Sequence, residues 1–175
     1  MIKIFFSCLH MLDLQLYIAS NEKGLVAIGI NQSEESFIKD IKKFSPLENI
    51  TYNKSKNHQF LQQITEYFQG ARKQFTIPLD LKGTPFQKKV WNTLLEIPFG
   101  EVVSYQTIAN KIGNPKAVRA VGLANKRNPI PIIVPCHRVI GMNMKLVGYN
   151  GGIDIKEKLL AFEGIKIEKE KVVNR

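Results

Sequence analysis

The stretch Pro131-Ile-Ile-Val-Pro-Cys-His-Arg-Val139 places a lone thiol beside an imidazole and a guanidinium, behind an apolar segment that contains two prolines. Proline fixes φ and lacks an amide N–H, so this segment can continue neither a helix nor a central strand. We therefore expect it to run extended through the core and to present Cys136 at a sharp turn. Most cysteines are inert core residues. The position between Pro135 and His137 makes Cys136 a candidate nucleophile instead.

Sharp helix boundaries precede this stretch. Thr84-Pro85-Phe86-Gln87 combines a capping box with proline at the first helical position, which predicts a helix start. Ser104 is the expected N-cap of a second helix, which ends at Gly113. Asn114-Pro115 is expected to cap a third helix, from residue 116 to about residue 126. Two short helices joined through a glycine are typical of a helix-turn-helix.

The N-terminal half predicts a small mixed domain with no repeats. Its expected elements are a strand with alternating apolar residues at 12–18, a turn at 20–24, a buried strand at 25–30, a helix capped by Ser33, a polar loop to about Asn57, and an amphipathic helix that carries Phe60, Leu61, Ile64 and Phe68. Near the C-terminus, Asp154 and Glu157 predict one more capped helix, which ends at Gly164.

The cysteine count and the N-terminus indicate a reducing compartment. Cys8 and Cys136 are too few for a disulfide framework and form no C-x-x-C pair. The apolar run 2–9 is interrupted by His10 and Asp13, so it does not predict a signal peptide. No stretch has transmembrane length. We expect a cytoplasmic protein, nuclear if the source is a eukaryote, with no membrane partner.

The positive charge is concentrated in the second half. Residues 1–81 hold nine Lys/Arg against eight Asp/Glu, whereas residues 82–175 hold sixteen against seven. A basic surplus restricted to one half favours a surface that binds a polyanion. A merely solvated basic face would have the same composition, so charge alone leaves both interpretations open.

Taken together, these motifs resemble the O6-alkylguanine-DNA alkyltransferases, the methylated-DNA–protein-cysteine methyltransferases. The resemblance rests on ordered segments from Thr84 to Gly164: Thr84-Pro-Phe-Gln87, Gly100-Glu-Val-Val-Ser-Tyr105, Arg119-Ala-Val-Gly122, Asn128-Pro129, Pro135-Cys-His-Arg-Val139, Gly148-Tyr149, Leu159-Leu160 and Glu163-Gly164. It implies an α+β fold, with a ribonuclease-H-like α/β scaffold domain at 1–81 and a mostly helical domain with a helix-turn-helix at 82–175.

The resemblance also implies an activity and its catalytic residues. In that family one alkyl group passes irreversibly from guanine O6 to a cysteine, once per molecule, and Cys136 matches the acceptor. A thiolate is the reactive form, and an unperturbed thiol with a pKa of about 8.5 is mostly neutral at pH 7, so we expect the imidazole of His137 to ionise Cys136. His137 matches the general base, which acts through a bound water. Glu163 matches the carboxylate that orients it, and Asn128 the residue that braces the turn.

Further matches imply a base-binding pocket. Tyr105 matches the tyrosine that hydrogen-bonds guanine N3 and crowds the 3′ phosphate. The backbone carbonyls of Cys136 and Val139 are expected to accept from the exocyclic amine, and Tyr149 to pack against the base. Asn150 stands where a serine or arginine is common, with its backbone N–H facing O6, which leaves the width of the pocket open. O4-alkylthymine is likewise left open as a substrate.

The helix-turn-helix matches the family's DNA-binding element. Arg119 matches the arginine finger that fills the stack after the base is flipped out, and Ala120 and Gly122 allow close approach of the helix. The expected partner is double-stranded DNA bearing O6-alkylguanine, bound by a monomer through the minor groove, with little sequence preference. His10 and His58 have no metal-ligand spacing, so we expect neither a metal nor a cofactor.

Three other functions are consistent with parts of the sequence. A non-catalytic lesion-binding protein of the alkyltransferase-like kind would replace the cysteine, so Cys136 argues against it. A helix-turn-helix regulator with an unreactive thiol would need neither Glu163 nor Asn128. A thiol hydrolase with a Cys–His pair would turn over repeatedly and would not explain Arg119 or the basic half of the chain.

Overall fold

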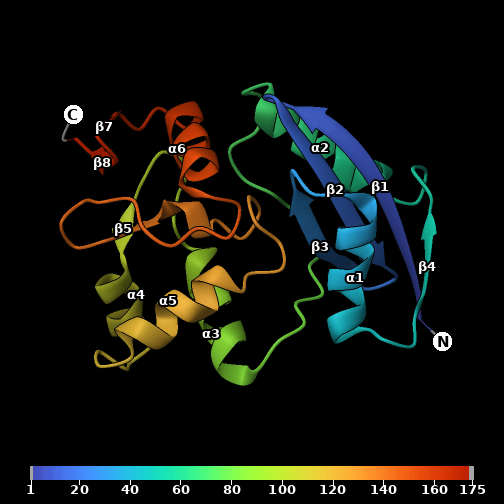
Figure 1. Cartoon of the computed structure of the whole chain (residues 1–175), viewed down its shortest axis with the longest axis horizontal. Coiled ribbons are helices and arrows are strands. Elements are labelled where there is room, and N and C mark those ends of the chain that lie inside the picture. Colours follow the sequence, from blue (N-terminus) through green and yellow to red (C-terminus); the bar gives the residue numbers. More distant parts are fainter. Residues whose placement is uncertain (1, 174–175) are drawn as a thin grey trace. The chain divides into compact units, whose positions relative to one another are not determined.

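The computed structural model describes residues 2–173 of the chain (Figure 1). The chain divides into two compact units, Met1–Lys82 and Gly83–Arg175. The division falls one residue after the domain boundary that the sequence predicts. None of the helices among the described residues is long and apolar enough to cross a membrane.

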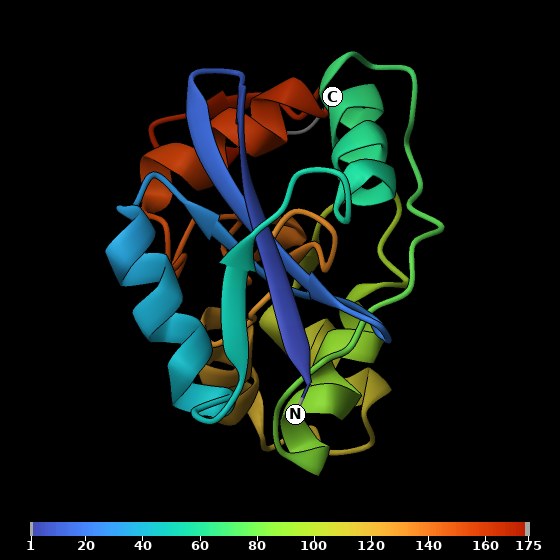
Figure 2. The ribbon, with the colours of Figure 1, turned by 90° about the vertical axis from the view of Figure 1, so that its right-hand side faces the viewer.

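The first unit is built on a four-stranded mixed sheet. Its strands are β1 (Lys3–Met11), β2 (Leu14–Asn21), β3 (Gly24–Ile30) and β4 (Asn49–Tyr52), in the spatial order β3-β2-β1-β4. The first three form an antiparallel meander, whereas β4 lies parallel to β1 at the edge (Figure 2). A parallel neighbour requires a crossover connection, which α1 (Glu34–Phe44) provides.

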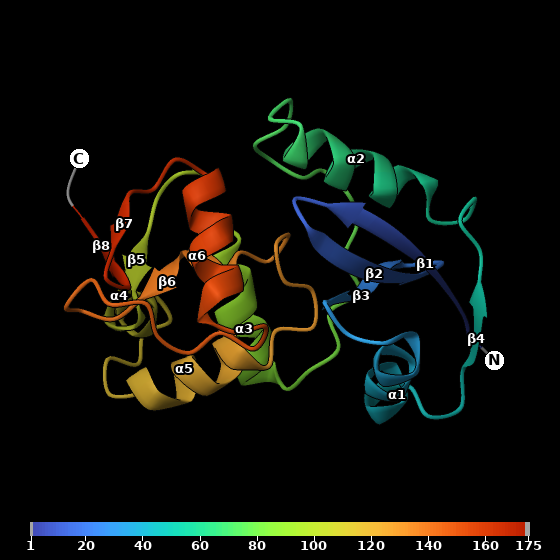
Figure 3. The ribbon, with the colours of Figure 1, turned by 45° about the horizontal axis from the view of Figure 1, so that its top comes forward.

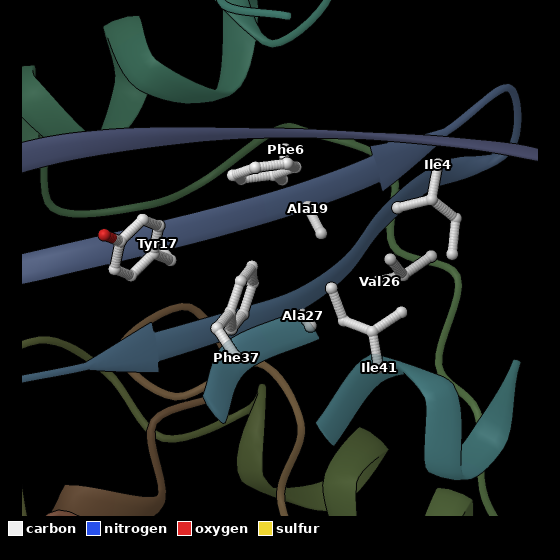
Figure 4. Packing of buried hydrophobic residues seen from close by; sticks show 8 residues of the cluster. All are labelled: Ile4, Phe6, Tyr17, Ala19, Val26, Ala27, Phe37 and Ile41. Atoms are coloured by element: carbon white, nitrogen blue, oxygen red, sulfur yellow. The ribbon is translucent and has the colours of Figure 1, made fainter. Parts of the chain in front are cut away.

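Two helices cover opposite faces of this sheet, α1 on one and α2 (His58–Phe68) on the other (Figure 3). Ser33 accepts a hydrogen bond from the amide of Ser36, which confirms the predicted cap of α1. Side chains from α1 and three strands pack together (Figure 4): Ile4, Phe6, Tyr17, Ala19, Val26, Ala27, Phe37 and Ile41. The apolar side chains of the period-two strand pattern and of the helical pattern therefore pack in one core.

Two predictions for this unit were wrong. Leu12 does not belong to the strand but forms, with Asp13, a two-residue turn in which both residues have positive φ (53° and 58°). Such a turn matches the twist of an antiparallel pair. The expected polar loop before Asn57 contains β4, which the sequence did not reveal because this edge strand is short and largely exposed.

The second unit is mostly helical, as predicted, and the α+β fold class is confirmed. Its elements are α3 (Pro85–Leu94), β5 (Val103–Ser104), α4 (Tyr105–Lys111), α5 (Val118–Lys126), the 3-10 turn η1 (Cys136–Arg138), β6 (Val139–Ile140), α6 (Ile153–Phe162), β7 (Ile167–Glu168) and β8 (Lys171–Val172). The Thr84 capping box and the Ser104 cap are both present.

Three local predictions for this unit were also wrong. Residues 131–135 do not run extended: Ile132 has φ 76°, and the amide of Val134 donates to the carbonyl of Ile130, so the segment is a tight turn. Helix α5 begins at Val118, without a side-chain cap, rather than at Asn114-Pro115. Helix α6 likewise has Gly152 at its N-cap and no side-chain cap, although Asp154 does lie in its first turn.

Candidate active site

Cys136 begins the single turn η1, which leads directly into β6. Its amide donates to the carbonyl of Val134 (2.8 Å), and the residue as a whole is 4% exposed. The amide group of Asn128 holds the preceding turn at both ends. It donates to Val134 O (2.7 Å) and accepts from the amide of Ile130 (2.9 Å). Asn128 therefore holds the turn that leads into Cys136, which is the role that the sequence analysis expected for it.

The carboxylate of Glu163, at the C-cap of α6, is the centre of a buried polar cluster. His137 Nε2 lies 2.9 Å from its Oε1, Arg138 donates through Nε (2.9 Å) and Nη2 (2.8 Å), and the amide of Gly100 donates at 3.2 Å. Burial would raise the pKa of this carboxyl, but the hydrogen bonds and charges of His137 and Arg138 hold it well below its usual range. Glu163 is therefore a carboxylate at neutral pH.

This carboxylate fixes the tautomer of His137. Because an ionised carboxylate can only accept, Nε2 of His137 carries the proton and donates it to Glu163. The other ring nitrogen, Nδ1, is buried and has no hydrogen-bond partner among the described residues. Burial lowers the pKa of the His137 imidazole. The ring is consequently neutral, and Nδ1 is a free base that can take up a proton.

The electrostatics differ from the expectation of a preformed thiolate. Burial raises the pKa of the Cys136 thiol, and hydrogen bonding by Asn128, the charge of Lys156 and hydrogen bonding by Tyr149 oppose this only in part. The resting thiol is therefore protonated. A neutral thiol can still react if its proton passes to the neutral imidazole as the sulfur attacks. Both groups are therefore uncharged at rest, and the thiolate forms during the reaction.

The expected pocket residues occupy α4 and the connection between β6 and α6. Tyr105, the first residue of α4, is buried and donates from Oη to Val147 O (2.9 Å), and burial raises its pKa to about 12. Tyr149 and Val139 are buried, whereas Asn150 is exposed. The carbonyl of Cys136 already accepts from Asn125 Nδ2 (3.3 Å) and from the amide of Val139.

Lys156 is a functional candidate that the sequence analysis did not identify. Its side chain is fully buried, and Nζ donates to the main-chain carbonyls of Val139 and Val147. Nζ also lies 5.8 Å from the centroid of the Tyr105 ring. Burial lowers the pKa of Lys156 to about 8, against a rise from the nearby Cys136. The ammonium thus links three elements of the expected pocket.

We expect Lys156→Met to reveal this buried charge through the pH dependence of stability. The pKa of Lys156 is lower in the folded protein than in the unfolded chain. Between about pH 8 and about pH 10.5 the unfolded chain therefore holds a proton that the folded protein has lost, and the free energy of unfolding of the parent rises with pH across this window. Methionine does not titrate. The difference in unfolding free energy, parent minus variant, should rise by about 2 kcal/mol from pH 7 to pH 10. Urea titrations at both pH values measure it, and an unchanged difference would contradict a buried ammonium.

The expected DNA-binding residues all lie on α5, the second helix of the helix-turn-helix. Arg119 and Ala120 are exposed, and Gly122 is half-buried. A Cβ on Gly122 would come within 3.9 Å of the Tyr105 ring, an ordinary contact, so glycine is not required there by packing within the protein. The exposed face of α5 also carries Lys126. This face also carries the exposed Leu123, and none of its residues is acidic.

Asn125 is a second residue that sequence reasoning missed. It lies on the buried face of α5, four residues after Val121, and holds the carbonyl of Cys136. A polar residue at an apolar position of an amphipathic helix was the available signal. Lys156 gave the same kind of signal in α6, three and four residues before the buried Leu159 and Leu160.

The second unit combines a buried thiol, a neutral imidazole oriented by a carboxylate, and an exposed basic helix-turn-helix. These features define a nucleic-acid-binding protein that transfers a group to or through a cysteine. The family models agree. Residues 85–165 match the DNA binding domain, and residues 9–81 the ribonuclease-like domain, of 6-O-methylguanine DNA methyltransferase. The chain belongs to this family, as its sequence motifs predicted.

Individual relatives match over most of the chain. The methylated-DNA–protein-cysteine methyltransferase of Methanosarcina acetivorans is 50% identical over 149 residues, 85% of this chain and 91% of the relative. The crystal structure of Mycobacterium tuberculosis O6-methylguanine methyltransferase superposes with a TM-score of 0.79 at 40% identity, covering 91% of this chain and 92% of that one. The structure of the Mycobacterium tuberculosis protein in complex with DNA gives 0.76 at 39% identity, with the same coverage.

Proposed function

We propose that this protein repairs alkylated DNA by direct reversal, moving the alkyl group from guanine O6 to Sγ of Cys136, once per molecule. The observation that carries the proposal is the His137–Glu163 hydrogen bond directly after Cys136, on a turn braced by Asn128, within a chain of the 6-O-methylguanine DNA methyltransferase family. The neutral thiol and free Nδ1 give the residues complementary roles. Cys136 is the nucleophile, His137 the base and Glu163 its orienting partner.

The reaction is balanced without a cofactor. The sulfur forms a bond to the alkyl carbon as the bond from that carbon to guanine O6 breaks. The thiol proton passes to His137, and in the net reaction guanine takes up one proton on its ring. The imidazole therefore holds the proton only temporarily. Because S-alkylcysteine has no leaving group that water could displace readily, the protein is consumed in one turnover.

The pocket can stabilise the leaving guanine through Tyr105. Negative charge develops on the purine as the O6–carbon bond breaks, and a donor near N3 lowers that barrier. The Tyr105 hydroxyl has one proton, now donated to Val147 O. The substrate must therefore compete with this carbonyl. Val139 O accepts from Lys156 and has a second lone pair for the exocyclic amine, whereas Cys136 O is already doubly occupied. Val139 is thus the better-placed acceptor.

The target atom is inside a duplex, so the base must leave the stack, at a cost of about a few kcal/mol. We propose that α5 enters the minor groove as part of a monomer and that Arg119 fills the vacated space. We expect Arg119→Ala to slow repair of O6-methylguanine in duplex DNA about a hundredfold, yet to change the reaction with free O6-benzylguanine by less than about twofold.

The matched control for that prediction is Arg127→Ala, which removes the same charge at the C-cap of the same helix. This variant should weaken duplex binding slightly and leave the rate at saturating DNA unchanged. Single-turnover rates with both substrates separate the cases. Equal slowing by Arg119→Ala on duplex and free base would show that Arg119 does not act in base extrusion.

Cys136 also decides among the alternatives. A lesion-binding protein without chemistry would have no use for a thiol whose neighbouring base is held in the proton-accepting tautomer. A thiol hydrolase would release product and turn over repeatedly. Both cysteines are free thiols, which fits a protein that works in a reducing compartment, and we propose that repair takes place there. O4-alkylthymine would place its alkyl group at a similar position, and competition with O6-methylguanine DNA would test it as a second substrate.

A further inference from the structure

The C-terminal hairpin of β7 and β8 pairs with the segment that follows β6. The amide of Val172 donates to Met144 O (2.9 Å), the amide of Leu146 donates to Glu170 O (2.8 Å), and Lys145 lies opposite Lys171 as an antiparallel bridge. The segment 144–146 therefore forms a third strand beside the hairpin. Apolar contacts support it, since Leu146 is buried with Ile140, Leu160 and Ile165, and Ile167 and Val172 pack against them.

The third strand leads directly into the residues of the proposed base-binding pocket. Its next residue is Val147, whose carbonyl accepts from both Tyr105 Oη (2.9 Å) and Lys156 Nζ (2.9 Å). One residue later, Gly148 has φ 62°, and a Cβ there would lie 3.3 Å from Tyr105 Oη. The carbonyl of Val147 thus holds both Tyr105 Oη and Lys156 Nζ, and Val139 O holds Lys156 Nζ as well.

We propose that the β7–β8 hairpin is a positioning element for the alkyl transfer. It holds segment 144–146 as an added strand and so fixes the Val147 carbonyl that orients Tyr105 and Lys156. This inference rests on the proposed function. Because the hairpin acts on the pocket and not on the DNA-binding helix, its loss should slow the reaction with free base and with duplex by the same factor, unlike the loss of Arg119.

The hairpin turn is not optimised for stability. Lys169 and Glu170 have φ of 49° and 57°. Most residues with a Cβ adopt this left-handed backbone conformation only at a cost in free energy, whereas the pair Asn-Gly adopts it readily in a two-residue hairpin turn. The double substitution Lys169→Asn with Glu170→Gly should therefore strengthen the hairpin without touching the pocket. Both main-chain bonds to segment 144–146 can still form, because Glu170 contributes only its carbonyl.

The test compares three full-length variants. Val172→Pro removes the amide that donates to Met144 O, and Val172→Ala keeps that amide while shortening the side chain. We expect Val172→Pro to slow transfer from O6-benzylguanine and from duplex about tenfold each, with the loss in the rate constant at saturation, and Val172→Ala to stay within about threefold. Hydrogen exchange at the Leu146 amide should be faster in Val172→Pro and slower in the Asn-Gly variant.

Each result bears on the proposal. Val172→Pro reacting as fast as the parent, or exchange at Leu146 unchanged in the Asn-Gly variant, would overturn it. Slowing on duplex alone would also overturn it, because the hairpin would then act on DNA. If Val172→Pro does not fold, Val172→Ala and the Asn-Gly variant decide through both readouts: a transfer rate that does not fall as exchange at Leu146 becomes faster would overturn the proposal. Failure of the parent itself to react would contradict the proposed function, not the pairing of the hairpin.

Discussion

Replacing Cys136 with alanine should abolish alkyl transfer while leaving DNA binding intact. Among the described residues, Cys136 is the one whose sulfur follows the braced turn beside a proton-accepting imidazole, and His137, held by Glu163, is a base rather than a nucleophile in this geometry. Alanine removes one buried atom in a turn held by main-chain bonds and by Asn128, so the fold should lose only about 1 kcal/mol. DNA binding through α5 does not involve the sulfur.

The control is Cys8→Ala, the same substitution at the other cysteine, which is half-buried on β1. Loss of O6-methylguanine from a duplex and duplex binding should both be measured for the two variants. The parent and Cys8→Ala should repair equally, and Cys136→Ala should bind without repairing. Measurable repair by Cys136→Ala would remove this residue from the acceptor role.

Glu163→Gln should have the second largest effect, on activity and stability together. The amide cannot anchor the His137 tautomer in the same way, and in comparable triads loss of the orienting carboxylate costs about a thousandfold or more in rate. The same change leaves the Arg138 guanidinium buried without its counter-charge. Removing one partner of a buried ion pair typically destabilises a protein by about 3–5 kcal/mol.

Glu96→Gln is the matched control, because Glu96 pairs with Lys111 at 3.1 Å on the surface, where such pairs contribute about 1 kcal/mol or less. Chemical denaturation and single-turnover rates should be measured for both variants. A Glu163→Gln protein as stable as Glu96→Gln would contradict the buried ion pair. A stable Glu163→Gln protein with the parent's rate would contradict the orienting role.

The sequence predicted best where local chemistry acts alone. The Thr84 capping box and the Ser33 and Ser104 caps formed as expected, because each depends on residues within one turn. Strand β4 was missed since its pairing with β1 is fixed by residues more than forty positions away and its own side chains are largely exposed. The sequence of a short, exposed edge strand therefore contains little pattern from which its pairing could be predicted.

The sequence analysis named the residues of the candidate site but not the electrostatics that their burial imposes. Motifs identified Cys136, His137, Glu163 and Asn128, and the structure brings these four residues together. Sequence reasoning expected an ionised thiol, because it considered the neighbouring base without the burial that raises the pKa of Cys136. Lys156 was missed for a related reason. A lysine among charged neighbours in sequence is expected on the surface, and this expectation outweighed its position on the apolar face of α6, where the fold buries it.

The most direct test is mass spectrometry of the protein after incubation with excess duplex DNA that contains O6-methylguanine. We predict a mass increase of one methyl group for one hydrogen, located on the peptide that contains Cys136, with one lesion lost for each protein molecule. A methyl group on any other residue, an unmodified protein, or several lesions repaired per molecule would contradict transfer to Cys136.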